Sequence, residues 1–135
     1  MTLITEARGI IQAQFELDWN SRTEVAYPNV EYTPTRDQSW VRVAVDHNLS
    51  SQQTLGSVGN RVFRRLGLVF VQVFTEKNEG QKSSDELVKA VLDIFEGKQL
   101  QGIWFRDARV QEIGIDEDNW FQVNISIEFQ YDTIK

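Results

Sequence analysis

The stretch GLVFVQVF, residues 67 to 74, is apolar on both of its alternating faces. Successive side chains of a β-strand point to opposite sides of the sheet, so the two sets can be separated. One side carries Leu66, Leu68, Phe70 and Phe74, interrupted only by Gln72, and the other carries Val69, Val71 and Val73. Such a strand belongs in the middle of a sheet that is covered on both sides. The rest of the chain must therefore supply neighbouring strands and two covers.

Two other segments alternate regularly enough to be strands. SWVRVAV, residues 39 to 45, places its valines on one face, and WFQVNISIEFQY, residues 120 to 131, alternates almost throughout. The second face of this last segment is polar, which predicts that it meets water. GIWFRDARV, residues 102 to 110, is a less regular candidate strand.

Helical spacing appears twice. Apolar residues from Ala7 to Trp19 predict a helix over about residues 6 to 18, with Thr5 as its N-cap. Ser83 and Glu86 have the spacing of a capping box, and the apolar stripe that follows predicts a second helix that ends at Gly97.

Together these segments predict an α+β fold in a single domain, residues 1 to 135. We expect two main helices packed on a mixed, predominantly antiparallel sheet of about four to five strands. The short runs 25–27 and 30–32 lie in the segment that carries both prolines. Because proline cannot donate a hydrogen bond to a sheet, we expect these runs to be edge or connecting pieces.

Two helices can cover one face of a sheet. The face formed by Val69, Val71 and Val73 then has no obvious cover, and two suppliers are equally compatible with the sequence. One is a partner subunit. The other is the first helix together with the proline-bearing segment of the same chain.

The segment from Asp46 to Asn60 is long and polar, and it contains Gly56 and Gly59. A loop of this length in a compact domain is usually functional or mobile. We expect a flexible assembly loop here, whose candidate contact residues are His47, Gln52, Gln53, Leu55, Gly56 and Gly59.

Charge and composition exclude several functions. Fourteen basic and twenty acidic residues give a net charge of −6, which opposes general binding to nucleic acid, although an acidic passage would let DNA slide. The absence of cysteine excludes disulfides, thiolate catalysis and cysteine-ligated metals. No apolar run approaches the roughly 20 residues that span a bilayer, and the start has no signal-peptide pattern. We therefore expect a cytosolic protein without a membrane contact.

No motif predicts a catalytic, cofactor-binding or metal site. His47 follows Asp46, but the sequence places no nucleophile beside this pair, so a solvated loop histidine is expected. GSVGNR, residues 56 to 61, lacks the strand before it and the Lys-Ser/Thr ending of a phosphate-binding loop. DEDN, residues 116 to 119, lacks the glycine and the closing Glu of a calcium loop and is expected to be an acidic hairpin turn.

Arg61, Arg64 and Arg65 form the one basic concentration. Three arginines here can contact nucleic acid, pair with carboxylates of a neighbouring subunit, or remain solvated. The net acidity favours protein contact over DNA, and solvated charges remain an alternative.

The order of the pieces resembles the tail terminator (tail completion) proteins of long-tailed bacteriophages, including the lambda gpU-like group and a related phage family of unknown function. The resemblance runs over nearly the whole chain, through VAYPNVEYTP, WVRVAV, the arginine pattern from Arg64 onward, IFEGK, GIWFRDARV and WFQVNISIEFQYD.

This resemblance implies a structural virion protein. It would assemble in the host cytoplasm into a homohexameric ring that caps the head-proximal end of the tail tube, stops polymerisation and receives the head-side connector. DNA would pass through the lumen. From charge and position, we expect the subunit or tube interface to include Arg61, Arg64, Arg65, Arg106, Arg109, Trp40 and Arg42.

Three alternatives stay open on the sequence. Another neck or head-tail joining component shares the size and the assembly logic. A small-molecule-binding α+β module and a small hydrolase that works through His47 come from other classes.

Overall fold

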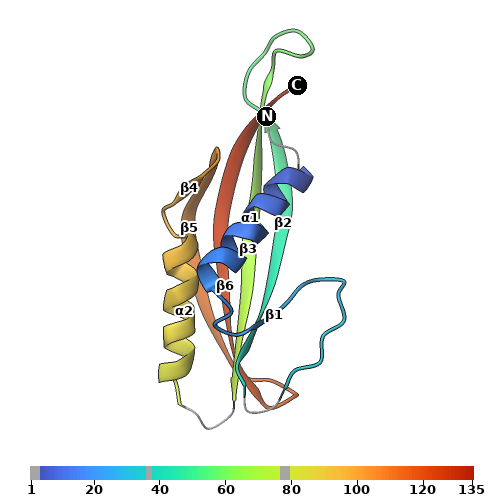
Figure 1. Cartoon of the computed structure of the whole chain (residues 1–135). Helices are drawn as coiled ribbons and strands as arrows, with labels where there is room; N and C mark the ends of the chain where they lie inside the picture. Colours follow the sequence, from blue (N-terminus) through green and yellow to red (C-terminus); the bar gives the residue numbers. More distant parts are fainter. Residues whose placement is uncertain (1–3, 36–37, 77–79) are drawn as a thin grey trace.

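The computed structural model describes residues 4–35, 38–76 and 80–135. Within them, two helices lie on one side of a single sheet of six strands (Figure 1). The helices are α1 (Ile4–Trp19) and α2 (Lys82–Phe95), and the strands are β1 (Glu24–Ala26), β2 (Trp40–Gln52), β3 (Val62–Glu76), β4 (Gln99–Leu100), β5 (Ile103–Ile115) and β6 (Trp120–Ile134). The α+β class is confirmed. The predicted strand number was too low because β1 and β4 are only three and two residues long, too short to show alternation.

The strands lie in the order β1-β2-β3-β6-β5-β4. Only β1 and β2 pair in parallel; the other pairs are antiparallel, so the sheet is mixed and predominantly antiparallel. β3 pairs with β2 on one side and with β6 on the other along its whole length. The apolar stretch 67–74 therefore occupies a central strand, as its two apolar faces predicted.

Both helices cover the face of β3 that carries Val69, Val71 and Val73. All three valines are fully buried in one cluster with residues of α1 and α2. Phe15 of α1 stacks on Trp19 at 5.0 Å and on Phe95 of α2 at 6.1 Å between ring centroids, which joins the helices over the sheet. Of the two suppliers that the sequence left open, the chain itself covers this face, but it does so with α1 and α2 and not with α1 and the proline-bearing segment, because α2 returns to the same side of the sheet as α1.

The opposite face, which we call the open face, has no helix over it in the part of the chain that the structure describes. Leu66, Leu68 and Phe70 are only half-buried there. At one end of this face the proline-bearing segment contributes Tyr32 to an aromatic cluster around Phe74. The uncovered apolar surface thus lies on the side of the sheet opposite to Val69, Val71 and Val73.

The helix starts differ from the predicted caps. Thr5 lies inside α1, and α2 begins at Lys82, before the predicted capping box. Gln81 occupies the cap position without a side-chain hydrogen bond, and the Ser84 hydroxyl donates back to the Gln81 carbonyl at 2.9 Å. The end of α2 follows the prediction, because Gly97 adopts the left-handed conformation with φ of 70°.

The turn end of the β2–β3 hairpin, which we call the hairpin arm, is drawn at the top of Figure 1, and β6 stays paired with β3 down to Val62. The predicted loop from Asp46 to Asn60 was therefore too long, because Asp46 to Gln52 pair with β3 as strand. Only residues 53–61 form the connection. The pairing partners, including the arginines of β3, lie too far along the chain for local polarity to reveal them.

Candidate functional site

The open face combines polar and apolar side chains from the four long strands. Strand register places them in rows across the sheet: Arg42 with Gln72, Asn124 and Gln111, then Ala44 with Phe70, Ser126 and Arg109. The next row contains Asp46, Leu68 and Glu128. The predicted wet face of residues 120–131 is confirmed, because Gln122, Asn124, Ser126, Glu128 and Gln130 all point to this side. A surface with a half-buried apolar centre and a charged surround is typical of protein contact.

Trp40 and Arg42 lie at one end of the open face, in the aromatic cluster. Trp40 stacks on Phe74 with 4.0 Å between centroids and meets Trp120 edge-on at 6.1 Å. The Arg42 guanidinium lies 5.3 Å from the Trp40 ring. Trp40 is 5 % exposed, and its buried indole nitrogen has no hydrogen-bond partner among the described residues. Burial inside this chain accounts for the ring, while Arg42 stays half-exposed at the surface.

The tip of the hairpin arm presents two apolar side chains to solvent. Leu55 is 92 % exposed and Val58 is 82 % exposed. The tip is nevertheless tied by its own hydrogen bonds: the Gln53 amide donates to Val62 O at 2.8 Å, and the Asn60 amide donates to Ser57 O at 3.0 Å. Gly56 and Gly59 turn the chain with φ of 144° and 93°. An ordered turn that displays apolar residues is suited to docking in a partner's groove.

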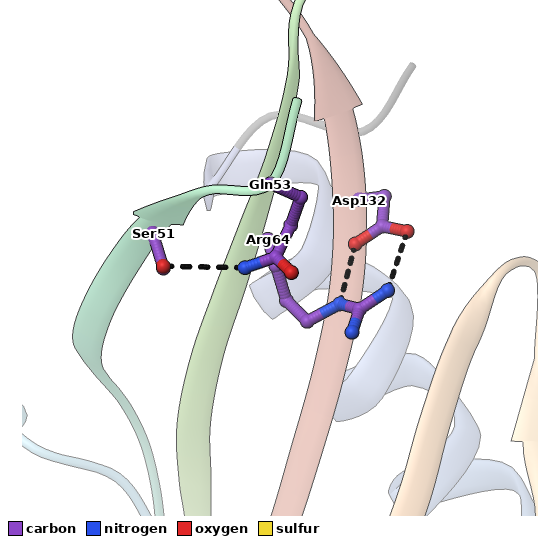
Figure 2. Close-up of polar contacts among 4 residues, drawn as sticks. All are labelled: Ser51, Gln53, Arg64 and Asp132. Atoms are coloured by element: carbon purple, nitrogen blue, oxygen red, sulfur yellow. Dashed lines mark hydrogen bonds and ion pairs between the residues drawn. The ribbon is translucent and has the colours of Figure 1, made fainter. Parts of the chain in front are cut away.

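Two sets of polar contacts lie at the base of the arm, one at the end of β2 and one between β3 and β6. Gln53 donates to the Ser51 hydroxyl at 3.2 Å, and Arg64 forms a two-pronged ion pair with Asp132 of β6, with Nε to Oδ1 at 3.0 Å and Nη2 to Oδ2 at 3.3 Å (Figure 2). This pair lies on the open-face side and is substantially exposed. It joins the first strand after the turn to the last strand of the chain.

The three clustered arginines do not form one patch. Arg64 and Arg65 are adjacent in β3, so their side chains leave opposite faces of the sheet. Arg65 donates to the Ser50 hydroxyl at 3.1 Å, and Arg61 donates to the Lys135 carbonyl at 3.3 Å. Each arginine has a partner within the chain. Contact with a neighbouring subunit would have to share or replace these bonds.

Arg106 and Arg109 are exposed along β5, which is separated from β3 by β6 in the strand order. Arg109 stands in the open-face row of Phe70, and Arg106 lies in a bulge between Phe105 and Ala108. β5 also exposes Trp104, Val110, Ile113 and Ile115, which are 44 to 56 % accessible. The sequence analysis did not predict that these apolar residues would be exposed. The irregular alternation of residues 102–115 was the available signal that one side of the strand is not buried.

His47 is packed inside the base of the arm rather than in a solvated loop. Its Nε2 lies 2.8 Å from the Tyr131 hydroxyl, and its ring meets Phe129 edge-on at 5.2 Å. Burial, and then the positive charges of Arg8 and Arg65, lower the pKa of His47, while Asp46 opposes the shift. The histidine pairs with Gly67, where a Cβ would collide with the Asp46 carbonyl oxygen and lie 2.5 Å from Phe129 Cζ. This arrangement positions the ring as a packing element.

The acidic turn at residues 116–119 was correctly predicted. Asp116 Oδ1 accepts hydrogen bonds from the amides of Asp118 and Trp120, both at 2.9 Å, so this carboxylate closes the β5–β6 hairpin. Among the described residues, no group of three or more acidic or histidine side chains is placed to hold a metal ion. In the same part of the chain, no helix combines the length and apolar character required to cross a bilayer.

An open groove of about 1220 Å³ lies between the end of α1, β1 and α2. Its walls mix both signs of charge, including Asp18, Glu86, Arg22, Lys89 and Lys98. Small-molecule sites are usually more enclosed and more apolar.

Comparisons with known proteins agree with the architecture. A family model described as "Phage tail terminator protein" matches residues 8–129. No curated protein matches the chain. One solved structure, whose title states no function, is similar over 94% of this chain and 96% of its own length, with a TM-score of 0.63 and 20% sequence identity. At that identity, the likeness shows a shared fold.

Proposed function

The chain belongs to the phage tail terminator family, and from this premise we propose that it forms a ring that caps the head-proximal end of a tail tube. The ring stops tube polymerisation and offers the attachment surface for the head-side connector. Membership gives the protein a structural role in the phage tail. The family match over residues 8–129 is the observation that carries this proposal, because it covers α2, most of α1 and nearly all of the sheet.

Two surfaces of the fold support a role in assembly. The open face leaves Leu66, Leu68 and Phe70 half-buried, and the hairpin arm presents Leu55 and Val58 to solvent. Single exposed apolar residues are ordinary on protein surfaces, but a grouped set marks a contact site. Contacts with copies of the same chain and with the tube protein would bury these residues. The virion is then the site of function.

The charge of the chain is consistent with DNA passing through such a ring without being held. The net charge of −6 repels a polyanion, and Arg61, Arg64 and Arg65 already bond to partners within the chain. A lumen that bound DNA tightly would obstruct its passage during ejection.

Electron microscopy of the protein mixed with growing tail tubes tests the proposal. We expect the protein at one end of each tube and an arrest of further growth. Binding along the sides of tubes, or no binding, would contradict the terminator role. Attachment to the head connector without any effect on tube growth would favour a head-tail joining component instead.

A further inference from the structure

The outer edge of β5 is unpaired over most of its length. β4 pairs only with Ile103 and Trp104, and the Phe105 amide donates to the Lys98 carbonyl at 2.8 Å. From Arg106 to Ile115, in the part of the chain that the structure describes, no strand lies on the outer side of β5. The backbone groups that point outward from this stretch are therefore available to another strand.

A regular segment within that edge is suited to pairing. Bulges interrupt the register between Phe105 and Ala108 and between Glu112 and Gly114. Between them, residues 108–112 pair with β6 without interruption, and Val110 in their centre is 44 % exposed. An exposed edge of this kind, bearing aliphatic side chains, recruits a strand from another chain.

We propose that residues 108–112 of β5 pair with the outer edge of β2 in a second copy of this chain. The inference rests on the proposed ring and names its contact surface. β2 and β5 are the two long strands farthest apart in the sheet, with short β1 and β4 outside them. Because these edges are different surfaces, repeated pairing is heterologous, as a ring requires.

Strand direction favours this pairing. Three successive antiparallel steps, β2 to β3, β3 to β6 and β6 to β5, make β5 run opposite to β2. A rotation about an axis along the strands keeps every direction unchanged. The β5 of one copy therefore meets the β2 of the next in the antiparallel orientation that most of the sheet already uses.

The charges at the two edges are complementary. Arg106 and Arg109 are exposed on β5, while Asp46 is exposed on β2, on the open face. Within one chain β3 and β6 separate these strands, so Asp46 cannot reach either arginine. Joining the edges of two copies brings them within one strand of each other. Among the described residues, β1 covers the outer edge of β2 only from Trp40 to Arg42, and the Arg8 guanidinium donates to the Val45 carbonyl. In that part of the chain, the outer edge of β2 is therefore free from Asp46 onward.

Sedimentation and amide hydrogen exchange of the full chain test the proposal, from micromolar to near-millimolar concentration. We expect the mass to rise with concentration while the outward-pointing amides among residues 108–112 become protected. The variant Arg109→Glu should weaken association several-fold, and adding Asp46→Arg should restore it. Lys82→Glu reverses one exposed charge at the start of α2, away from this edge, and is the matched control.

Three results would overturn the proposal: a mass that stays monomeric at every concentration, an oligomer in which the outward-pointing amides among residues 108–112 still exchange freely, or a double variant no better than Arg109→Glu alone. The proposed function fails separately. A protein that caps tubes through another surface refutes only the edge pairing, whereas one that associates through β5 and ignores tube ends refutes only the terminator role.

Discussion

Arg64 and Asp132 face each other directly across the β3–β6 ladder, and both oxygens of the carboxylate accept a hydrogen bond from the guanidinium. The pair joins the return strand of the hairpin arm to the last strand of the chain. Both side chains are exposed, at 38% and 45%, so the pair fixes geometry more than it stabilises the fold.

Replacing Asp132 with Asn should leave the midpoint of thermal unfolding nearly unchanged and should loosen the arm. We expect faster amide exchange at the arm's base, in residues 62–65, because the guanidinium loses its charged acceptor. Hydrogen exchange read by mass spectrometry measures this. Equal exchange in both proteins would show that the ladder alone orders the arm.

Replacing Gly67 with Ala should destabilise the fold by about 1–3 kcal/mol, the usual cost of overpacking a core. The added Cβ would collide with the Asp46 backbone oxygen, which cannot move without breaking the β2–β3 ladder. Urea unfolding gives the value. Gly9→Ala is the matched control, because a Cβ there meets no atom within 4 Å and alanine favours a helix by up to about 1 kcal/mol. Equal stability of the two variants would contradict the packing around Gly67.

Acidification should destabilise the protein through His47, its one histidine. The folded state lowers the pKa of this ring, chiefly by burial, so the unfolded chain binds more protons below the ordinary value near 6.5. The stability that the neutral ring contributes is full above that pH and is lost as the pH falls toward the folded pKa. Urea midpoints measured at pH 7.5 and at mildly acidic pH should differ more for the wild type than for His47→Gln. An identical pH dependence would show that His47 does not titrate differently on folding.

Whether the helices cover the valine face of β3 can be tested by making the same substitution at two positions. Val71→Thr buries a hydroxyl in the covered core and should cost about 1–3 kcal/mol. Val110→Thr makes the same change at an exposed site of β5 and should cost under about 0.5 kcal/mol. Chemical denaturation of the two variants compares them. A small cost at Val71 would mean that the helices do not cover this face.

Charges at the tip of the hairpin arm should affect assembly without affecting folding. Leu55→Lys and Val58→Lys change side chains that are already in water, so stability should move by less than about 0.5 kcal/mol. Under the proposed function, the same variants should bind tube ends less well. Microscopy of capped tubes measures the effect, with Leu17→Lys, at an exposed site of α1, as control. Undiminished capping would remove the arm from the tube interface.

The strands of the sheet could be predicted from the sequence because alternation is a local property. In the stretch 67–74 and in the segment 120–131, side chains two residues apart are of the same kind, which identifies the two faces of each strand. Both segments form strands of the sheet, as predicted. The acidic turn at 116–119 and the glycine that ends α2 were equally readable, since their chemistry involves neighbours in the chain.

The candidate surfaces were less predictable. Sequence polarity suggested a loop from Asp46, yet the hairpin continues to Gln52 because β3 supplies partners. Charge alone grouped Arg64 with Arg65. Because successive side chains of a strand point to opposite faces, Arg64 instead bonds to Asp132 on one face, and Arg65 bonds to Ser50 on the other. The free edge of β5 has no local signature at all, since it depends on β4 being short.

The sequence by itself determined that β3 would be central, that two helices would pack on the sheet, and that the last strand would have one wet face. Only the tertiary structure decided which side of β3 the helices cover and which strand edges remain free. Periodicity separates the two faces of a strand, but it does not say which face the helices will bury. That depends on the side of the sheet to which α2 returns after β3, and this side is decided by contacts between residues far apart in the chain.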